Sequence, residues 1–192
     1  MHNNFDQEKH IYTIDGEVVP SVTQVLPKQK FFVSEEHLKK ITEEGTDNHS
    51  YIKMFHDTGN TFNKPELEDL KKLYIEHQYL NGEKVCWEKS LYDPVLKFAG
   101  TPDLICEKSI IDFKRSFSYA EYHALQMAGY NLLRKENKLG DVKTWLILWW
   151  DNGRWKVRNV YNDMAELIFK ECLWAWHGGI TLDIMIKKYL KR

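Results

Sequence analysis

Residues 98–116, FAGTPDLICEKSIIDFKRS, place charged side chains inside an otherwise apolar stretch, and this constrains the fold more than any other part of the chain. The pattern predicts two short strands, 98–106 and 109–114, joined by a polar tip. Because alternate side chains of a strand share a face, Asp112 and Lys114 point to one side of the sheet. The intervening Phe113 points to the other side.

The register of this predicted hairpin brings two acidic residues together. With a tight turn at 107–108, Asp103 lies roughly opposite Asp112, and directly opposed side chains have Cβ atoms about 5 Å apart. Two carboxylates at this distance repel each other unless a proton or a metal ion lies between them. Hard divalent cations prefer carboxylate oxygens, and Lys114 adds a positive charge beside such an ion. This combination is typical of phosphodiester hydrolysis.

The pair Pro102-Asp103 followed by Asp112-Phe113-Lys114 resembles the PD-(D/E)XK nuclease superfamily in its D-x-K form. Other motifs, in a consistent order along the chain, resemble the RecB-like branch of that superfamily. These motifs are Gly45-Thr46-x-x-His49, Trp87-Glu88 and Gln126-x-x-x-Tyr130. The segment 12–26 is similar to the N-terminal segment of the mitochondrial genome maintenance exonucleases and of phage exonucleases.

The resemblance implies an α/β fold with a restriction-endonuclease-like core, in which a mixed central β-sheet is flanked by helices, and an N-terminal helical extension. We expect a single nuclease domain over residues 1–192, a length that allows one sizeable core. An N-terminal hairpin and helices would occupy about 1–80, the nuclease core about 83–161, and C-terminal helices about 162–192.

Local patterns predict the individual elements of this domain. A hairpin over 11–19 turns at Asp15-Gly16, a dipeptide suited to a type I′ turn. Apolar periodicity and capping residues predict helices at 22–26, 35–44, 46–57, 66–80, 119–135, 163–177 and 182–190. Further strands are predicted at 84–91, 144–150 and 154–160.

The resemblance also assigns ligands for a metal ion. Asp103, Asp112 and the backbone carbonyl of Phe113 would hold Mg²⁺ or Mn²⁺. His49 would add a nitrogen ligand, which favours Mn²⁺ over Ca²⁺; the alternative is a polar residue on a helix surface. Glu88 would contact a metal ion through water or hold a second ion, and its alternative role is an exposed ion pair with the adjacent lysine.

Three further residues would act on the substrate. Lys114 would position the attacking water or stabilise the charged transition state. Gln126 would donate a hydrogen bond to a phosphate or contact Lys114, and Tyr130 would contact the scissile phosphate or a stacked base. The alternative for Gln126 and Tyr130 is the ordinary polar surface of an amphipathic helix.

A basic stripe offers a second candidate contact with nucleic acid. Arg154, Lys156 and Arg158 alternate with apolar residues and therefore share one face of the predicted strand 154–160. Such a stripe could contact backbone phosphates. It could equally protect an edge strand against aggregation, and the sequence slightly favours this second interpretation.

Composition limits the remaining choices. The net charge of −1 and the pI of about 6.7 are not those of a protein that coats nucleic acid, so DNA binding requires a local basic surface. The three cysteines Cys86, Cys106 and Cys172 do not match the four-cysteine iron–sulfur cluster of some RecB-like nucleases, and we expect no cluster. The apolar run 145–150 is too short to span a bilayer, and the polar N-terminus is no secretory signal. We expect an intracellular protein, not secreted and without membrane contact.

Together these features predict a metal-dependent exonuclease that acts on linear DNA, including single strands. The resemblance implies products that carry a 5′-phosphate, and we expect the enzyme to serve in DNA recombination, repair or phage replication. One alternative is a structure-specific or nicking endonuclease on the same core. Another is a DNA-binding recombination accessory protein that does not cut. The sequence identifies no protein partner.

Overall fold

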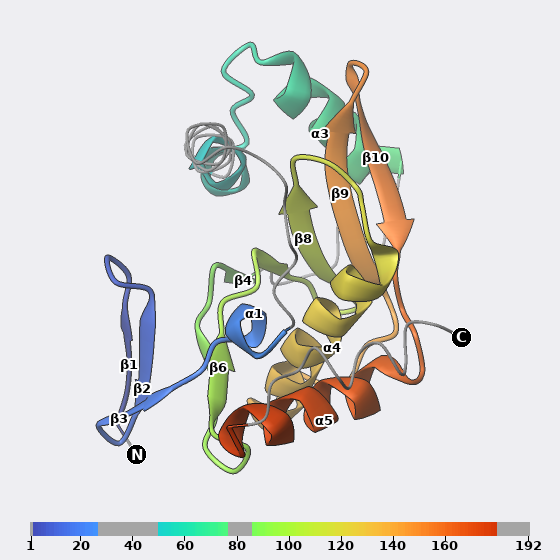
Figure 1. The fold of residues 1–192 in the computed structure, drawn as a ribbon. Coiled ribbons are helices and arrows are strands. Elements are labelled where there is room, and N and C mark those ends of the chain that lie inside the picture. The colour runs from blue at the N-terminus through green and yellow to red at the C-terminus, as the bar shows by residue number, and fades with distance from the viewer. Residues whose placement is uncertain (1, 27–49, 77–85, 180–192) are drawn as a thin grey trace, which may run out of the picture.

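The computed structural model describes residues 2–26, 50–76 and 86–179, and these form a mixed α/β fold (Figure 1). The central sheet has five strands in the order β10-β9-β8-β7-β4. Their bounds are β4 Cys86–Trp87, β7 Leu104–Ile105, β8 Ile110–Lys114, β9 Trp145–Asp151 and β10 Arg154–Asn159. Strands β8 and β9 pair in parallel, and the other neighbours pair antiparallel. The predicted α/β class with a mixed sheet is therefore confirmed.

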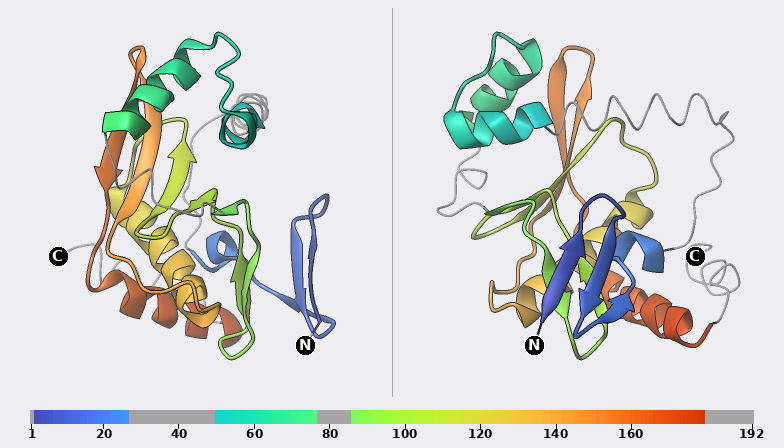
Figure 2. Two further views of the ribbon diagram at one scale, coloured as in Figure 1. Left: turned by 180° about the vertical axis from the view of Figure 1, so that it is seen from behind. Right: turned by 90° about the vertical axis from the view of Figure 1, so that its left-hand side faces the viewer.

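The central sheet separates two apolar cores. Helices α1 (Val22–Val25), α4 (Ala120–Glu136) and α5 (Ala165–His177) contribute to the core on one side. On the other side lie α3 (Pro65–Glu76) and the helical residues 50–58. Figure 2 shows α3 and α5 at opposite ends of the molecule. No helix among the described residues is long and apolar enough to cross a membrane.

Alternate residues of β8 enter different cores, as their spacing predicts. Ile110 packs with the α4 core, whereas Ile111 and Phe113 pack with the α3 core. Asp112 and Lys114, which alternate with these residues, therefore lie on the α4 side of the sheet. The arrangement matters for the site because the same face also receives the side chains of α4.

A separate three-stranded sheet forms the N-terminus, next to β6 in Figure 1. It consists of β1 (Asn3–Asp6), β2 (Ile11–Ile14) and β3 (Glu17–Val19). The predicted turn at Asp15-Gly16 is confirmed, because both residues have positive φ values, 49° and 86°. Strand β1 was not predicted from the sequence, because its polar residues show no apolar alternation.

Two predicted strands are interrupted. The prediction of one strand over 98–106 is wrong: β6 (Phe98–Gly100) pairs with β5 (Leu91–Asp93) in a two-stranded sheet, and only β7 joins β8. Pro102 lies in the break between β6 and β7. Proline has no backbone N–H, so it cannot donate a hydrogen bond to a neighbouring strand. The predicted strand 84–91 is also wrong, because β4 ends before Glu88, which has a φ of 43°. The predicted helices 35–44 and 182–190 lie outside the described residues.

Candidate active site

The β7–β8 hairpin brings the two predicted acids together. Leu104 pairs with Ile111, and continuing this register by one residue sets Asp103 opposite Asp112. The tip at 107–108 is closed as predicted, since the residues on either side of it share a backbone hydrogen bond of 3.0 Å. The predicted register is confirmed even though Asp103 itself lies just outside β7.

Asp103 is held from two directions. Its Oδ2 atom accepts a hydrogen bond of 2.8 Å from the backbone N–H of Phe113. Its own backbone carbonyl accepts one of 3.0 Å from the N–H of Glu88. The break in the strand at 101–103 thus replaces ladder hydrogen bonds with contacts that fix an acidic side chain against β8.

Asp112 is a buried carboxylate, only 2% exposed, whose two oxygens have different partners. Oδ1 accepts a hydrogen bond of 3.2 Å from Nε2 of Gln126 on α4. Oδ2 lies 2.6 Å from the ammonium nitrogen of Lys114. That contact is an ion pair, so the negative charge of Asp112 is matched by Lys114. An ionised carboxylate has about four lone-pair sites on its two oxygens, so Asp112 can still coordinate a cation in addition to these two partners.

Lys114 remains charged at this position. Burial by itself lowers the pKa of its ammonium group, but the negative charges of Asp112 and Asp103 raise it more, and the net pKa lies above its ordinary value. Its side chain is 29% exposed, compared with 3% for Asp112. Lys114 therefore places a permanent positive charge between a buried carboxylate and the surface.

Gln126 and Tyr130 lie at the site, but both are buried, with exposed fractions of 3% and 6%. Gln126 donates to Asp112 and, at 3.3 Å, to the Tyr130 hydroxyl. This differs from the predicted contact between Gln126 and Lys114, and neither side chain forms the polar helix surface that was the alternative. The shared face of α4 thus orients Asp112, and burial raises the pKa of Tyr130 well above its ordinary value.

The remaining predicted metal ligands are only partly placed. Glu88 forms an ion pair of 3.3 Å with Lys53, so its partner is not the adjacent lysine. Phe113 carries its ring into the α3 core, and its carbonyl belongs to the same strand as Asp112. His49 lies outside the described residues. Within 2–26, 50–76 and 86–179, no three His, Cys, Asp or Glu side chains gather closely enough to hold a metal ion by themselves.

Two neighbours of the site were not identified as site residues from the sequence. Tyr122 and His123 lie in the first turn of α4. The charges of both Lys114 and Asp112 affect the pKa of each side chain. Burial lowers the pKa of His123, and the positive charge of Lys114 lowers it further. His123 precedes Gln126 by three residues and therefore lies on the same face of the helix, but only the packing of α4 shows that this face is buried against the acids.

A chain of hydroxyl groups connects the N-terminal sheet to the loop that carries Asp103. The Tyr12 hydroxyl lies 2.8 Å from Oγ1 of Thr101, which lies 2.9 Å from Oγ of Ser90. Tyr12 is 1% exposed, and burial raises its pKa. The chain gives the N-terminal sheet a specific contact two residues before Asp103, which the sequence did not predict.

The cysteines do not take part in the site. All three are free; Cys106 and Cys172 are buried, and Cys86 is half-buried. Burial raises the pKa of the Cys106 thiol and raises that of Cys172 to about 11, so these thiols stay protonated near neutral pH.

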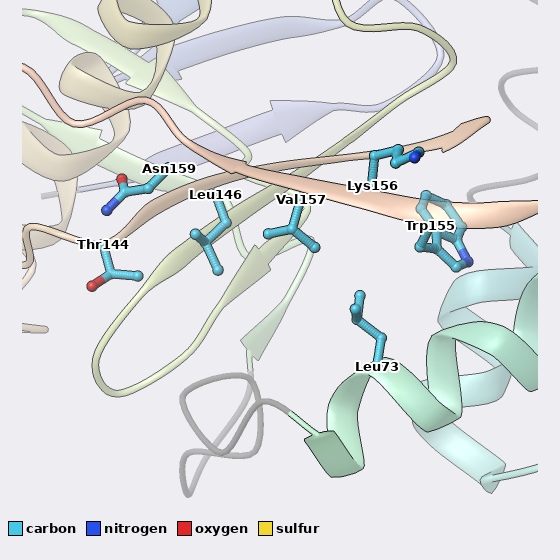
Figure 3. A pocket seen from close by; sticks show the side chains of 7 residues that line it. All are labelled: Leu73, Thr144, Leu146, Trp155, Lys156, Val157 and Asn159. Atoms are coloured by element: carbon cyan, nitrogen blue, oxygen red, sulfur yellow. The ribbon is translucent and has the colours of Figure 1, made fainter.

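A cavity of about 600 Å³ lies on the other face of the sheet, between α3 and the β9–β10 hairpin (Figure 3). Its lining residues are Leu73, Thr144, Leu146, Trp155, Lys156, Val157 and Asn159. Leu146, Trp155 and Val157 belong to the α3 core or pack against it, so the cavity opens away from Asp112. None of these seven residues is acidic, and the cavity is therefore separate from the predicted metal site.

Comparison with known proteins does not define a family. No family model matches the chain, and no curated protein sequence matches it. A solved structure described as the crystal structure of SSO0001 superposes with a TM-score of 0.38 and 13% sequence identity. The similarity covers 66% of this chain and 68% of that one. A similarity at this level determines neither fold family nor function.

Proposed function

We propose that this chain is a metal-dependent deoxyribonuclease with a restriction-endonuclease-like core, and that it degrades linear DNA, including single strands, as an exonuclease. The observation that carries the proposal is the convergence of Asp103, Asp112 and Lys114 at one point beside β8. A pair of carboxylates, one buried and one half-buried, with a charged lysine beside them has the composition expected for hydrolysis of a phosphodiester.

The residues present fit a divalent cation. Asp112 is a buried carboxylate whose oxygens keep lone pairs beyond their contacts with Lys114 and Gln126, and Asp103 lies opposite it. We expect Asp103, Asp112 and the carbonyl of Phe113 to hold Mg²⁺ or Mn²⁺, both of which accept carboxylate and carbonyl oxygens. When bound, such an ion lowers the pKa of a coordinated water and offsets charge on the phosphate.

The chain's own side chains have distinct tasks in this proposal. Lys114 presents its ammonium group to the phosphate, where it stabilises negative charge as the bond to the leaving oxygen breaks. Gln126 fixes the orientation of Asp112 through its hydrogen bond to Oδ1. The Tyr130 hydroxyl accepts a hydrogen bond from Gln126 and so fixes its position. Because Tyr130 is buried, it acts on the substrate only through this contact. Glu88 helps to hold the backbone of Asp103.

The experiment is a cleavage assay with a matched pair of lysine variants. Purified protein is incubated with circular and linear DNA, single- and double-stranded, in Mg²⁺, Mn²⁺ or EDTA. Lys114→Met should lower the cleavage rate by about 10²–10³, the usual cost of removing one group that stabilises transition-state charge. Lys108→Met is the control, because Lys108 is an exposed lysine at the tip of the same hairpin.

Each outcome separates the proposal from its rivals. Cutting of linear DNA alone, only with metal, supports the exonuclease. Cutting of circles would show a structure-specific or nicking endonuclease on the same site. Binding of DNA without any cutting would show a DNA-binding accessory protein and overturn the enzyme. Equal rates for the two lysine variants would remove Lys114 from the mechanism.

A further inference from the structure

Two rows of side chains cross the central sheet and connect the candidate active site with the basic stripe of β10. Asp112 is paired with Ile147 of β9, and Ile147 with Arg158 of β10. In the neighbouring row, Lys114 is paired with Trp149, and Trp149 with Lys156. Paired residues on adjacent strands share a face, so Arg158 and Lys156 lie on the same side of the sheet as the acids.

The rest of β10 agrees with this assignment. Trp155 and Val157 point into the α3 core or pack against it. Lys156 borders the cavity where it joins the strand, but its side chain leaves β10 on the side opposite to Val157, as Figure 3 shows. Adjacent strands lie about 4.8 Å apart, so the backbone of β10 lies about 10 Å from that of β8. The stripe is therefore close to the site and separated from it only by β9.

Two stacked aromatic rings lie between the basic stripe of β10 and the candidate active site. Phe117, in the loop after β8, stacks on Trp149 with ring centroids 4.7 Å apart and an interplanar angle of 27°. The guanidinium carbon of Arg158 lies 5.0 Å from the centroid of the Phe117 ring. This cation–π contact holds Arg158 in place, while the residue as a whole remains exposed.

The charges of the stripe have no acidic partner among the described residues. Arg154, Lys156 and Arg158 form no ion pair there. Protection of a sheet edge accounts for charge on β10, which is an edge of the described sheet. It does not account for an arginine held by an aromatic ring on the face that carries Asp112 and Lys114.

We propose that Arg158 and Lys156 bind backbone phosphates of a single-stranded DNA segment that runs across β9 to the scissile bond at Asp112 and Lys114. The combination of basic side chains and aromatic rings is the one by which proteins hold single strands. The occupant is identified by charge: a polyanion fits cations that form no ion pair within the described part of the chain and lie beside a lysine that is itself charged. This inference rests on the proposed function and adds the path of the substrate.

The test measures binding in EDTA, where no cleavage occurs. A fluorescein-labelled 20-nucleotide oligo-dT is titrated with protein at several salt concentrations, and anisotropy gives the affinity. Each phosphate contact to a single strand contributes about 0.7 to the slope of log affinity against log salt. Arg158→Gln and Lys156→Gln should each reduce the slope by about 0.7, and the double variant by about 1.4. Arg158→Lys retains the charge and should retain most of the slope.

The control is Lys9→Gln, because Lys9 is an exposed lysine at the turn after β1 in the separate N-terminal sheet. A slope unchanged in Arg158→Gln, with a wild-type protein that binds and cleaves, would overturn this inference and leave the proposed function intact. Aggregation of that variant in size-exclusion chromatography with unchanged affinity would favour edge protection instead. A wild-type protein that neither binds nor cleaves DNA would overturn both. In cleavage assays the stripe variants should raise KM and leave kcat unchanged, which marks binding and not chemistry.

Discussion

Arg134 offers the sharpest test of how the site is held, because its buried side chain is bound entirely by backbone carbonyls among the described residues. This residue of α4 is only 1% exposed. It donates to two carbonyls next to the tip of the β7–β8 hairpin, Cys106 at 2.7 Å and Ser109 at 3.3 Å, and to a third in the tip at 3.2 Å. Two more bonds, of 2.8 and 3.4 Å, go to residues 139 and 140 after α4.

The cost of Arg134→Met follows from which carbonyls lose their partner. The Ser109 carbonyl keeps a backbone hydrogen bond, and residues 107 and 140 are exposed, so water can replace the arginine there. The carbonyls of Cys106 and Leu139, at buried and half-buried residues, lose their strong contacts. At about 1–3 kcal/mol for each of these two unsatisfied acceptors, the loss is about 2–6 kcal/mol. The total free energy of unfolding of a domain is about 5–15 kcal/mol, so this loss is a large part of it.

Urea unfolding monitored by circular dichroism measures this loss. Arg134→Lys should recover only part of it, because an ammonium group cannot reproduce the planar fork of a guanidinium. Lys138→Met is the matched control at an exposed position in the same segment and should change the unfolding free energy by less than about 0.5 kcal/mol. If Arg134→Met unfolds at the same urea concentration as the wild type, the guanidinium does not hold the hairpin, and the reasoning fails.

Three further predictions concern single residues. Gln126→Leu should lower the cleavage rate about 10–100-fold with DNA binding in EDTA unchanged, because Asp112 loses the contact that orients it; equal rates would contradict that role. Gly129→Ala should cost about 1–3 kcal/mol in urea unfolding, because the added Cβ would lie 2.7 Å from the ring of Phe169; an unchanged midpoint would show that α5 can shift. Burial lowers the pKa of His56 to about 4, so the folded state stays unprotonated while the unfolded chain, at about 6.5, takes up a proton. The stabilisation is present above pH 6.5 and should fall by about 1.4 kcal/mol per pH unit towards pH 4; His56→Gln should flatten this slope, and identical slopes would refute the assignment.

The sequence alone determined the local geometry of the acidic pair. Strand alternation and a two-residue turn were enough to predict that Asp112 and Lys114 share a face and that Asp103 lies opposite Asp112. These relations depend on backbone periodicity, which any strand imposes on its residues. The turn at Asp15-Gly16 was predictable because it follows from local preferences, whereas the class of fold was expected from the resemblance to a known family.

Only the tertiary structure decided which groups surround that pair. Helical spacing placed Gln126 and Tyr130 together but could not show that α4 packs its polar face inward, where Gln126 binds Asp112. Nothing near Arg134 in the sequence indicates a buried cation, because its carbonyl partners belong to loops 25–28 residues away or to the segment after its own helix.

The basic stripe shows the same division. Period-two spacing put Arg154, Lys156 and Arg158 on one face of a strand, but a strand has two faces and its sequence does not say which one meets the active site. The order of the strands and the parallel register of β8 with β9 settle that choice. Pairing between distant segments is determined by the packing of the whole sheet between its two cores, and no local pattern contains that information.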